Sequence, residues 1–225
     1  MKLRLENILE ASIQEFIRTG RPISSSHLYH SYNFGIKPAT IRLELEDLTD
    51  KGYLVQPYRS AGRIPSDAGY EFFIKKSLNS IDGIIPENRL GSLFRKSDWP
   101  GFLDLVSRRF RILGVISDID GRVYKSGLEV LIDQLDWGLA SELKSVIRDF
   151  ESIDDRLDQV VNVLSDQVIE VFVGRKSPVT SSDYLSVVMG RCGCEYGKTA
   201  LLAIGPKRMD YKKVIQMFRG INNIR

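Results

Sequence analysis

The sequence predicts an α+β fold in two domains, an N-terminal winged helix-turn-helix domain and a second α+β domain. Residues 1–78 show three helical patterns followed by a strand, a loop and a second strand, which is the order of a winged helix. Residues 102–225 mix strand-like and helical patterns, which favours an antiparallel sheet covered by helices. Residues 79–101 contain several Gly and Pro and are interpreted as a linker with some helix.

Three helices are predicted in the N-terminal domain. The first covers residues 3–18, where apolar side chains recur at helical spacing, and Thr19-Gly20 ends it. A short second helix lies in ISSSHLYHSY, with a serine as its N-cap. The third helix opens around Pro38, a residue suited to the first turn of a helix, and stops at Gly52. The apolar positions that predict the first helix are Leu5, Ile8, Leu9, Ile13, Phe16 and Ile17.

A β-hairpin with a stiff, basic loop is predicted after the third helix. Tyr53 to Gln56 form a short strand, and Arg63-Ile64 pair back as the second strand. The loop between them, QPYRSAGRIP, carries a proline at each side, which restricts its backbone. Ser66 then caps a fourth helix. This strand, loop and strand are interpreted as the wing.

The second domain is predicted to contain five strands and several helices. RILGVI is strand-like, and a turn at Asp120-Gly121 separates it from RVYKSG. Two helical segments follow, and VIEVFV, YLSVVMG and TALLAIG then predict three further strands. A last helix runs from about Met209 to Ile221.

Composition favours a soluble, cytoplasmic protein. The hydrophobic share of 43% and the charged share of 27% are ordinary for a globular chain, and a net charge of +3 means that any nucleic-acid signal must be local. No apolar run is long enough to cross a membrane, and the charged start MKLRLENILEASIQEF is unlike a secretory signal. Two cysteines, Cys192 and Cys194, do not make a disulfide framework and fit a reducing compartment.

The third helix carries the first candidate site. If Ile41, Leu45 and Leu48 form its buried stripe, then Ala39, Thr40 and Leu43 face away, with Arg42 on a flank. Such a helix can enter the major groove of DNA with its N-terminal residues on base edges. The alternative is an amphipathic helix whose outer face is simply solvated.

The loop favours the DNA-binding alternative. Arg59 and Arg63 flank Ser60-Ala61-Gly62, small residues that let a backbone approach a phosphate closely. Arginine also suits insertion into a narrow minor groove. The residues predicted to contact DNA are Ser25, Ser26, Lys37, Ala39, Thr40, Arg42, Leu43, Arg59, Ser60, Gly62 and Arg63.

Two separated stretches resemble one family. TGRPISSSHL, GIKPATIRLELEDLTDKGYLVQP and SAGRIPSDAGY are similar to the N-terminal winged helix of the bacterial heat-inducible transcription repressor HrcA family, and AIGPKRMDYKKVI resembles its C-terminal signature. The resemblance implies a repressor that binds as a homodimer to an inverted-repeat, double-stranded DNA operator upstream of chaperone genes. It also implies a GAF-like C-terminal domain and stabilisation by a GroEL-type chaperonin.

The chain departs from the family pattern in length and at one residue of the third helix. It is shorter than family members usually are, and the shortage falls between the winged helix and the second half. A reduced GAF-like domain without the inserted dimerisation region is therefore expected. The family commonly reads Ala-Thr-Ile-Arg-Asn in the recognition helix, whereas Leu43 stands here in place of the Asn.

Three further patterns are interpreted as structural. GCEYGKT is one residue too short for a phosphate-binding loop and leads into a strand-like run. Cys192 and Cys194 lack the second ligand pair of a zinc site. His27 and His30 lack further metal ligands and are interpreted as residues of a helix surface or as donors near a phosphate. We therefore predict no enzyme activity, catalytic residue, metal or cofactor. The alternative functions are a winged-helix regulator of another operon and a module that senses a ligand or partner.

Overall fold

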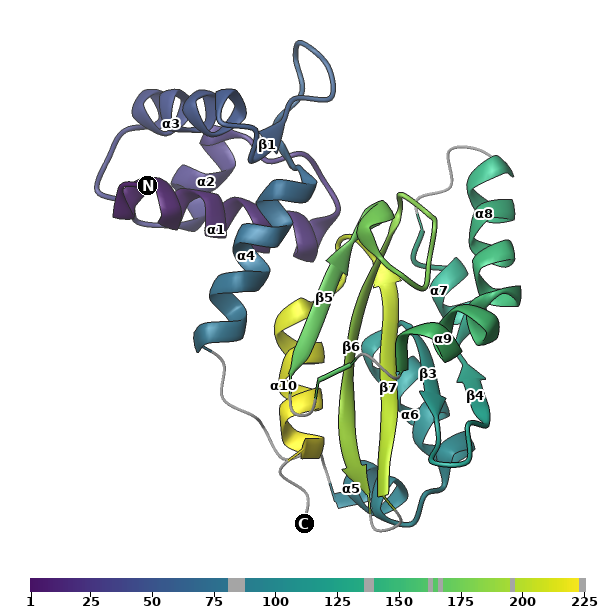
Figure 1. Cartoon of the computed structure of the whole chain (residues 1–225). Helices are drawn as coiled ribbons and strands as arrows, with labels where there is room; N and C mark the ends of the chain where they lie inside the picture. Colours follow the sequence, from purple (N-terminus) through teal and green to yellow (C-terminus); the bar gives the residue numbers. More distant parts are fainter. Residues whose placement is uncertain (81–87, 136–139, 162–163, 166–167, 195–196, 223–225) are drawn as a thin grey trace. The chain divides into compact units, whose positions relative to one another are not determined.

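Residues Met1–Lys76 and Ser77–Arg225 form two separate units in the computed structural model of the chain (Figure 1). The structure describes all residues except 81–87, 136–139, 162–163, 166–167, 195–196 and 223–225. No helix among the described residues combines the length and apolar character needed to cross a membrane.

The first unit begins with three helices, as the sequence predicts. They are α1 (Leu3–Thr19), α2 (Ser25–Ser31) and α3 (Pro38–Asp50). Ser24 is the N-cap of α2, and its hydroxyl accepts a hydrogen bond from the His27 amide at 3.1 Å. The three helices bury one apolar core, whose members include Ile8, Leu9, Ile13, Leu28, Ile41, Leu45 and Leu48.

A left-handed glycine ends α3 and directs the chain into the hairpin. Gly52 has φ +78°, the Tyr53 amide donates to the Leu48 carbonyl at 3.0 Å, and the Gly52 amide donates to the Thr49 carbonyl at 2.9 Å. These two bonds satisfy carbonyls that the helix end would otherwise leave without partners. A side chain at Gly52 would strain this left-handed backbone.

The hairpin is made by β1 (Leu54–Val55) and β2 (Ile64–Pro65), which pair in antiparallel fashion. Figure 1 shows its loop projecting beyond β1. The predicted second strand is shifted by one residue, because Arg63 pairs with Ile23 instead of with the first strand. Helix α4 (Asp67–Ser80) follows, and the Ser66 hydroxyl caps it by accepting from the Gly69 amide at 3.1 Å.

The segment at residues 79–101, predicted to be a linker with some helix, is helical over most of its described length. It contains α5 (Asn88–Arg95) and the start of α6 (Trp99–Phe110), and both helices belong to the second unit. Phe94 packs edge-on against Trp99 and Phe102, with ring centroids 5.4 and 5.2 Å away, and all three side chains are buried. The Gly and Pro count suggested a linker, but this aromatic cluster makes the segment part of a core.

The second unit is built on a five-stranded antiparallel sheet in the order β4-β3-β7-β6-β5. The strands are β3 (Leu113–Ser117), β4 (Val123–Ser126), β5 (Ile169–Val173), β6 (Leu185–Cys194) and β7 (Gly197–Pro206). The remaining helices are α7 (Leu128–Ile132), α8 (Ala140–Glu151), α9 (Ile153–Val161), the short 3₁₀ helix η1 (Gly174–Lys176) and α10 (Tyr211–Asn222).

Alternate residues of the central strands face two helical layers. Val187 and Met189 of β6 belong to a buried cluster with apolar residues of α7, α8 and α9. On the opposite face, Gly190 lies close to the Phe218 ring of α10, and Gly114 of β3 lies close to Leu103 of α6. The period of two in a strand therefore produces the observed helix–sheet–helix layering.

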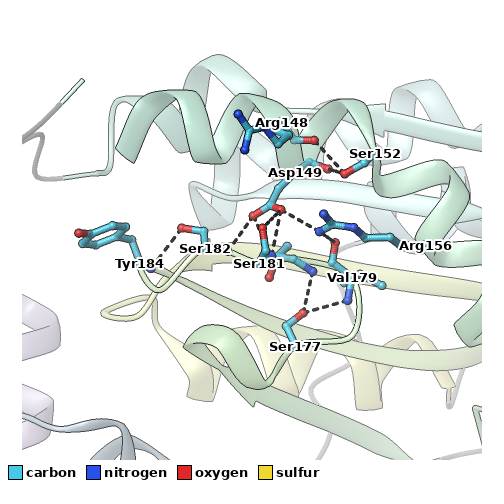
Figure 2. Close-up of polar contacts among 10 residues, drawn as sticks. Arg148, Asp149, Ser152, Arg156, Ser177, Val179, Ser181, Ser182 and Tyr184 are labelled. Atoms are coloured by element: carbon cyan, nitrogen blue, oxygen red, sulfur yellow. Dashed lines mark hydrogen bonds and ion pairs between the residues drawn. The ribbon is translucent and has the colours of Figure 1, made fainter. Parts of the chain in front are cut away.

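A buried carboxylate joins α8 to the loop before β6. Asp149 is 1% exposed, and it accepts hydrogen bonds from the Ser181 amide at 2.9 Å, the Ser181 hydroxyl at 2.7 Å and the Ser182 amide at 2.9 Å. Arg156 of α9 pairs with it at 2.8 Å. Figure 2 shows Asp149 pointing from its helix into this group of donors. Burial of the charge is tolerated because its oxygens are bonded.

Replacing Asp149 by Asn should destabilise the second unit by about 3 kcal/mol, because an amide group would face donors that need an acceptor and Arg156 would lose its counter-charge. Chemical denaturation followed by circular dichroism measures this loss. The matched control is Asp104→Asn, which makes the same change in an exposed surface pair with Arg108 and should stay within about 0.5 kcal/mol. Equal losses in the two variants would contradict the role assigned to Asp149.

Candidate nucleic-acid interface

The N-terminal half of α3 presents cationic, polar and apolar side chains to solvent. Lys37 is the N-cap residue and makes no side-chain capping hydrogen bond. Ala39, Arg42 and Leu43 are exposed, and Thr40 is half-buried. The stripe of Ile41, Leu45 and Leu48 is buried as predicted. The outward face of the helix therefore carries the residues that the sequence assigned to it.

The acidic residues in the rest of α3 are largely paired. Glu44 accepts from the Arg4 guanidinium at 2.9 Å, and Glu46 accepts from Arg42 at 3.3 Å. Asp47 pairs with Lys51. These pairs reduce the negative potential that the acidic sequence suggested, so the later turns of α3 repel an anionic partner less.

The hairpin loop is held in shape by a side chain that sequence reasoning missed. The Gln56 side-chain amide donates to the Arg59 carbonyl and to the Ala61 carbonyl, both at 3.0 Å, and the Ala61 amide donates to the Tyr58 carbonyl at 2.9 Å. The tip, which includes Arg59 and Ser60, is exposed. Gln56 fixes the backbone from which Arg59 projects, and nothing in its sequence pattern distinguishes it from another solvated amide.

Arg63 and Gly62 have internal partners that the sequence did not reveal. Arg63 is half-buried, and its guanidinium donates to the Thr49 hydroxyl at 3.1 Å. Its backbone amide and carbonyl form two hydrogen bonds of 2.8 Å with Ile23. A Cβ on Gly62 would lie 2.6 Å from the Ile23 carbonyl oxygen, so Gly62 allows a close approach within the protein. Of the loop residues predicted to contact DNA, Arg59 and Ser60 are the ones that are exposed.

Other residues of the SAGRIPSDAGY stretch also brace the fold. The Ser66 hydroxyl donates to the Gly52 carbonyl at 2.5 Å in addition to capping α4. A Cβ on Gly69 would lie 2.2 Å from the Tyr53 carbonyl oxygen. Most of this stretch therefore positions the loop, while its first residue, Ser60, lies at the exposed tip.

A buried glutamate ties α2 to α1. Glu15 of α1 accepts hydrogen bonds from Arg18 at 2.5 Å, from the Tyr32 hydroxyl at 3.1 Å, and bonds the His27 ring at 2.8 Å. Chiefly because of the Arg18 hydrogen bond, the pKa of Glu15 falls from 4.5 to about 2. His27 is thus a structural partner of a carboxylate, whereas His30 is exposed.

The residues predicted on α2 lie at its first turn. Ser25 is half-buried and Ser26 is exposed. Because α2 packs against α3 in the same unit, Ser26 and the start of α3 belong to one small helical assembly.

The family of the chain is shown by a match that covers most of the second unit. The HrcA protein C-terminal domain matches residues 72–215, which is more than half of the chain. The chain belongs to the HrcA family. Its second unit is accordingly the GAF-like C-terminal domain of HrcA proteins, and the sheet with helices on both faces is its observed form.

Relatives with curated names carry the same family name. The heat-inducible transcription repressor HrcA of Alkaliphilus metalliredigens is 54% identical over 67 residues, which is 30% of this chain and 20% of that protein. The heat-inducible transcription repressor HrcA of Chlorobium phaeobacteroides is 36% identical over 118 residues, which is 51% of this chain and 33% of that protein. Each match thus spans a third or less of the relative's own length.

One solved structure shares the fold over nearly the whole chain. The crystal structure of a hypothetical protein superposes with a TM-score of 0.79 at 17% identity, covering 99% of this chain and 97% of that one. At this identity the likeness concerns the fold alone.

The residues of the C-terminal signature make contacts within the second unit. The Tyr211 hydroxyl donates to the Lys207 carbonyl and contacts the Ser186 hydroxyl, both at 2.7 Å. Arg208 donates to the Gln134 carbonyl at 2.9 Å, and Met209 is buried. These contacts hold the start of α10 against β6 and against the segment that follows α7.

The GCEYGKT stretch lies in the β6–β7 hairpin, where Cys194 pairs with Gly197. A phosphate-binding loop requires a helix after it, and β7 follows here instead. Cys192 is buried in β6. Within the described part of the chain, no three His, Cys, Asp or Glu side chains are grouped so that they could hold a metal ion.

An open pocket of about 320 Å³ lies beside α8 in the second unit. Its carboxylates already have partners, because Glu142 accepts from the Tyr184 hydroxyl and Asp183 pairs with Lys207 at 3.0 Å. The Glu142 hydrogen bond is also the main reason why the pKa of Tyr184 is raised. The pocket residues are Ser141, Glu142, Ser145, Arg175, Ser181, Asp183 and Tyr184.

The Glu15 cluster should make stability depend on pH. Because the folded pKa of Glu15 lies below the unfolded value, its contribution is complete above about pH 5 and is lost as the pH falls towards 2. Glu15→Gln should cost about 1–3 kcal/mol at pH 7, and the difference from the wild type should shrink on acidification. Urea denaturation at pH 7, 5 and 3 measures both. Asp50→Asn, at an exposed carboxylate of the same unit, is the control.

Replacing each of the two loop arginines by alanine should change the stability of the first unit by different amounts. Arg63→Ala removes the bond to Thr49 from a half-buried site and should destabilise the first unit by about 1–2 kcal/mol. Arg59→Ala changes an exposed tip residue and should stay within about 0.5 kcal/mol. Denaturation midpoints test the pair, and similar midpoints would refute the internal role of Arg63.

Proposed function

We propose that this HrcA family member is a DNA-binding transcriptional repressor whose first unit is a winged helix-turn-helix domain. In this proposal α3 enters the major groove and the β1–β2 loop is the wing, which lies against the phosphate backbone or the minor groove. The carrying observation is that Lys37, Arg42 and Arg59 are exposed on the recognition-type helix and on a braced loop of one small unit.

The local chemistry suits an anionic, double-stranded partner. The start of α3 lacks a side-chain cap, and although Pro38 has no N–H and the Thr40 amide donates to the Lys37 carbonyl, the Ala39 amide can meet a phosphate together with the Lys37 side chain. Arg42 can exchange its exposed, weak pair with Glu46 for a guanine edge or a phosphate, and Thr40 can donate or accept beside it. Arg59 needs little further ordering, because Gln56 already shapes its loop.

The proposed DNA interface keeps the eleven residues that the sequence suggested, but it assigns two of them a different main role. Arg63 and Gly62 act mainly by holding the loop, and Arg59 and Ser60 make the contact at its tip. Ser25 and Ser26 approach the backbone from α2. Repression by occupying an operator needs binding and no bond-making step, so no residue is assigned a catalytic role.

The rest of the function follows from the family and is proposed with it. The DNA would be an inverted-repeat operator of heat-shock chaperone genes, and two copies of α3 would read its half-sites as a homodimer. The GAF-like unit would supply the dimer contact or the sensing input. A GroEL-type chaperonin is the proposed modulating partner.

The loop assignment predicts a specific salt effect. Arg59→Ala should weaken binding to all duplexes and should lower the slope of log K against log salt concentration by about 0.9, the value for one lost phosphate contact. Fluorescence anisotropy with random duplex DNA between low and moderate salt measures the slope. Arg122→Ala removes the same charge from an exposed turn of the second unit and should leave the slope unchanged.

Thr40→Ala serves as the comparison for sequence reading, because it should change which duplex is preferred and leave the salt slope intact. Binding stoichiometry in the same titrations reports whether two chains occupy one operator. A wild-type chain that shows no salt-dependent affinity for any duplex would overturn the proposed function.

A further inference from the structure

An exposed leucine stands at the centre of the outward face of α3. Leu43 is 64% exposed, and at 100° per residue it lies almost opposite the buried stripe of Ile41, Leu45 and Leu48. Ala39, one turn earlier on the same side, is exposed as well. These two side chains form an apolar step, Ala39–Leu43, on the part of the helix that the proposed function directs into the major groove.

The surroundings of the apolar step match a nucleic acid better than an apolar protein surface. Lys37 lies before it, and Arg42 lies beside it with its side chain 75% exposed. The neighbouring acidic residues Glu44 and Asp47 are paired with Arg4 and Lys51. An apolar centre with cations at its edge suits a groove whose walls are phosphates and whose floor contains one apolar group.

In the major groove that apolar group is the 5-methyl of thymine. We propose that Leu43, supported by Ala39, contacts a thymine methyl and makes thymine the preferred base at one position of each half-site. This inference rests on the proposed function, and it adds the chemical identity of a base that the helix reads. A leucine has no donor or acceptor, so the preference arises from apolar contact alone.

The test removes the methyl without changing any hydrogen bond. A binding site is first selected from random duplexes with the full chain, and each thymine is then replaced singly by deoxyuridine. At one position the wild type should lose about 4-fold in affinity, the factor that corresponds to one buried CH₂-sized group. All affinities are compared at one fixed salt concentration, since the electrostatic part varies with salt.

Variants identify the side chain that is responsible. Leu43→Ala should bind the thymine and the deoxyuridine sites equally, and Leu43→Asn should move the preference at that position towards adenine, whose edge an Asn can bond twice. Leu3→Ala shortens another exposed leucine of the same unit, which is 72% exposed, and should retain the wild-type preference. Because all these positions are exposed, the variants are expected to fold.

The outcomes separate the inference from the proposed function. If a site is selected but no deoxyuridine substitution weakens binding, or if Leu43→Ala keeps the sensitivity, the thymine contact is refuted and DNA binding stands. If no sequence is enriched, the proposed function fails and the inference fails with it. If Leu43→Ala leaves the affinity for the selected site intact but abolishes binding of the chain to a second protein chain, the apolar step Ala39–Leu43 is a protein contact and the inference is wrong.

Discussion

The pairing of Ile23 with Arg63 is the contact on which the first unit depends. Two backbone hydrogen bonds of 2.8 Å join the turn between α1 and α2 to the base of the hairpin loop. They are possible only because Gly62 has no side chain, since a Cβ there would lie 2.6 Å from the Ile23 carbonyl oxygen. The Arg63 guanidinium then reaches Thr49 on α3. One short segment thereby fixes the loop relative to the pair α1 and α2 and also relative to α3.

In this unit some polar side chains hold the fold together, and others are exposed to solvent. Side chains that look chemically active, such as Arg63 and His27, are engaged within the fold, whereas Arg59, Ser60 and Leu43 are exposed on supported backbone. A contact residue on a preordered segment loses little conformational freedom on binding, so more of its interaction energy reaches the complex. The paired acidic residues of α3 act in the same direction by weakening repulsion of an anionic partner.

In the second unit a buried carboxylate also joins elements that are far apart in the sequence. Asp149 of α8 accepts hydrogen bonds from the loop before β6 and pairs with Arg156 of α9, and it thereby joins the two helices to that loop. Such a charge has to be bonded on all sides to be tolerated in a core. The positions of the strands along the chain were predictable here, because most of the strands have a strong apolar pattern. The segment of α5 and α6 was not, because its Gly and Pro residues concealed aromatic side chains that pack only in three dimensions.

The sequence by itself determined the order of elements, the buried stripe of α3 and the outward position of Leu43. These depend on periodicities of 2 and 3.6 residues, which are properties of neighbouring positions. Only the tertiary structure decided what Gly62, Arg63, Gln56 and His27 do. Their partners lie on other elements or across a loop, as Arg63 does with Thr49 and His27 with Glu15, and no local pattern specifies such a distance. The type of a residue limits which hydrogen bonds and ion pairs its side chain can form, and the tertiary structure determines which of them do form.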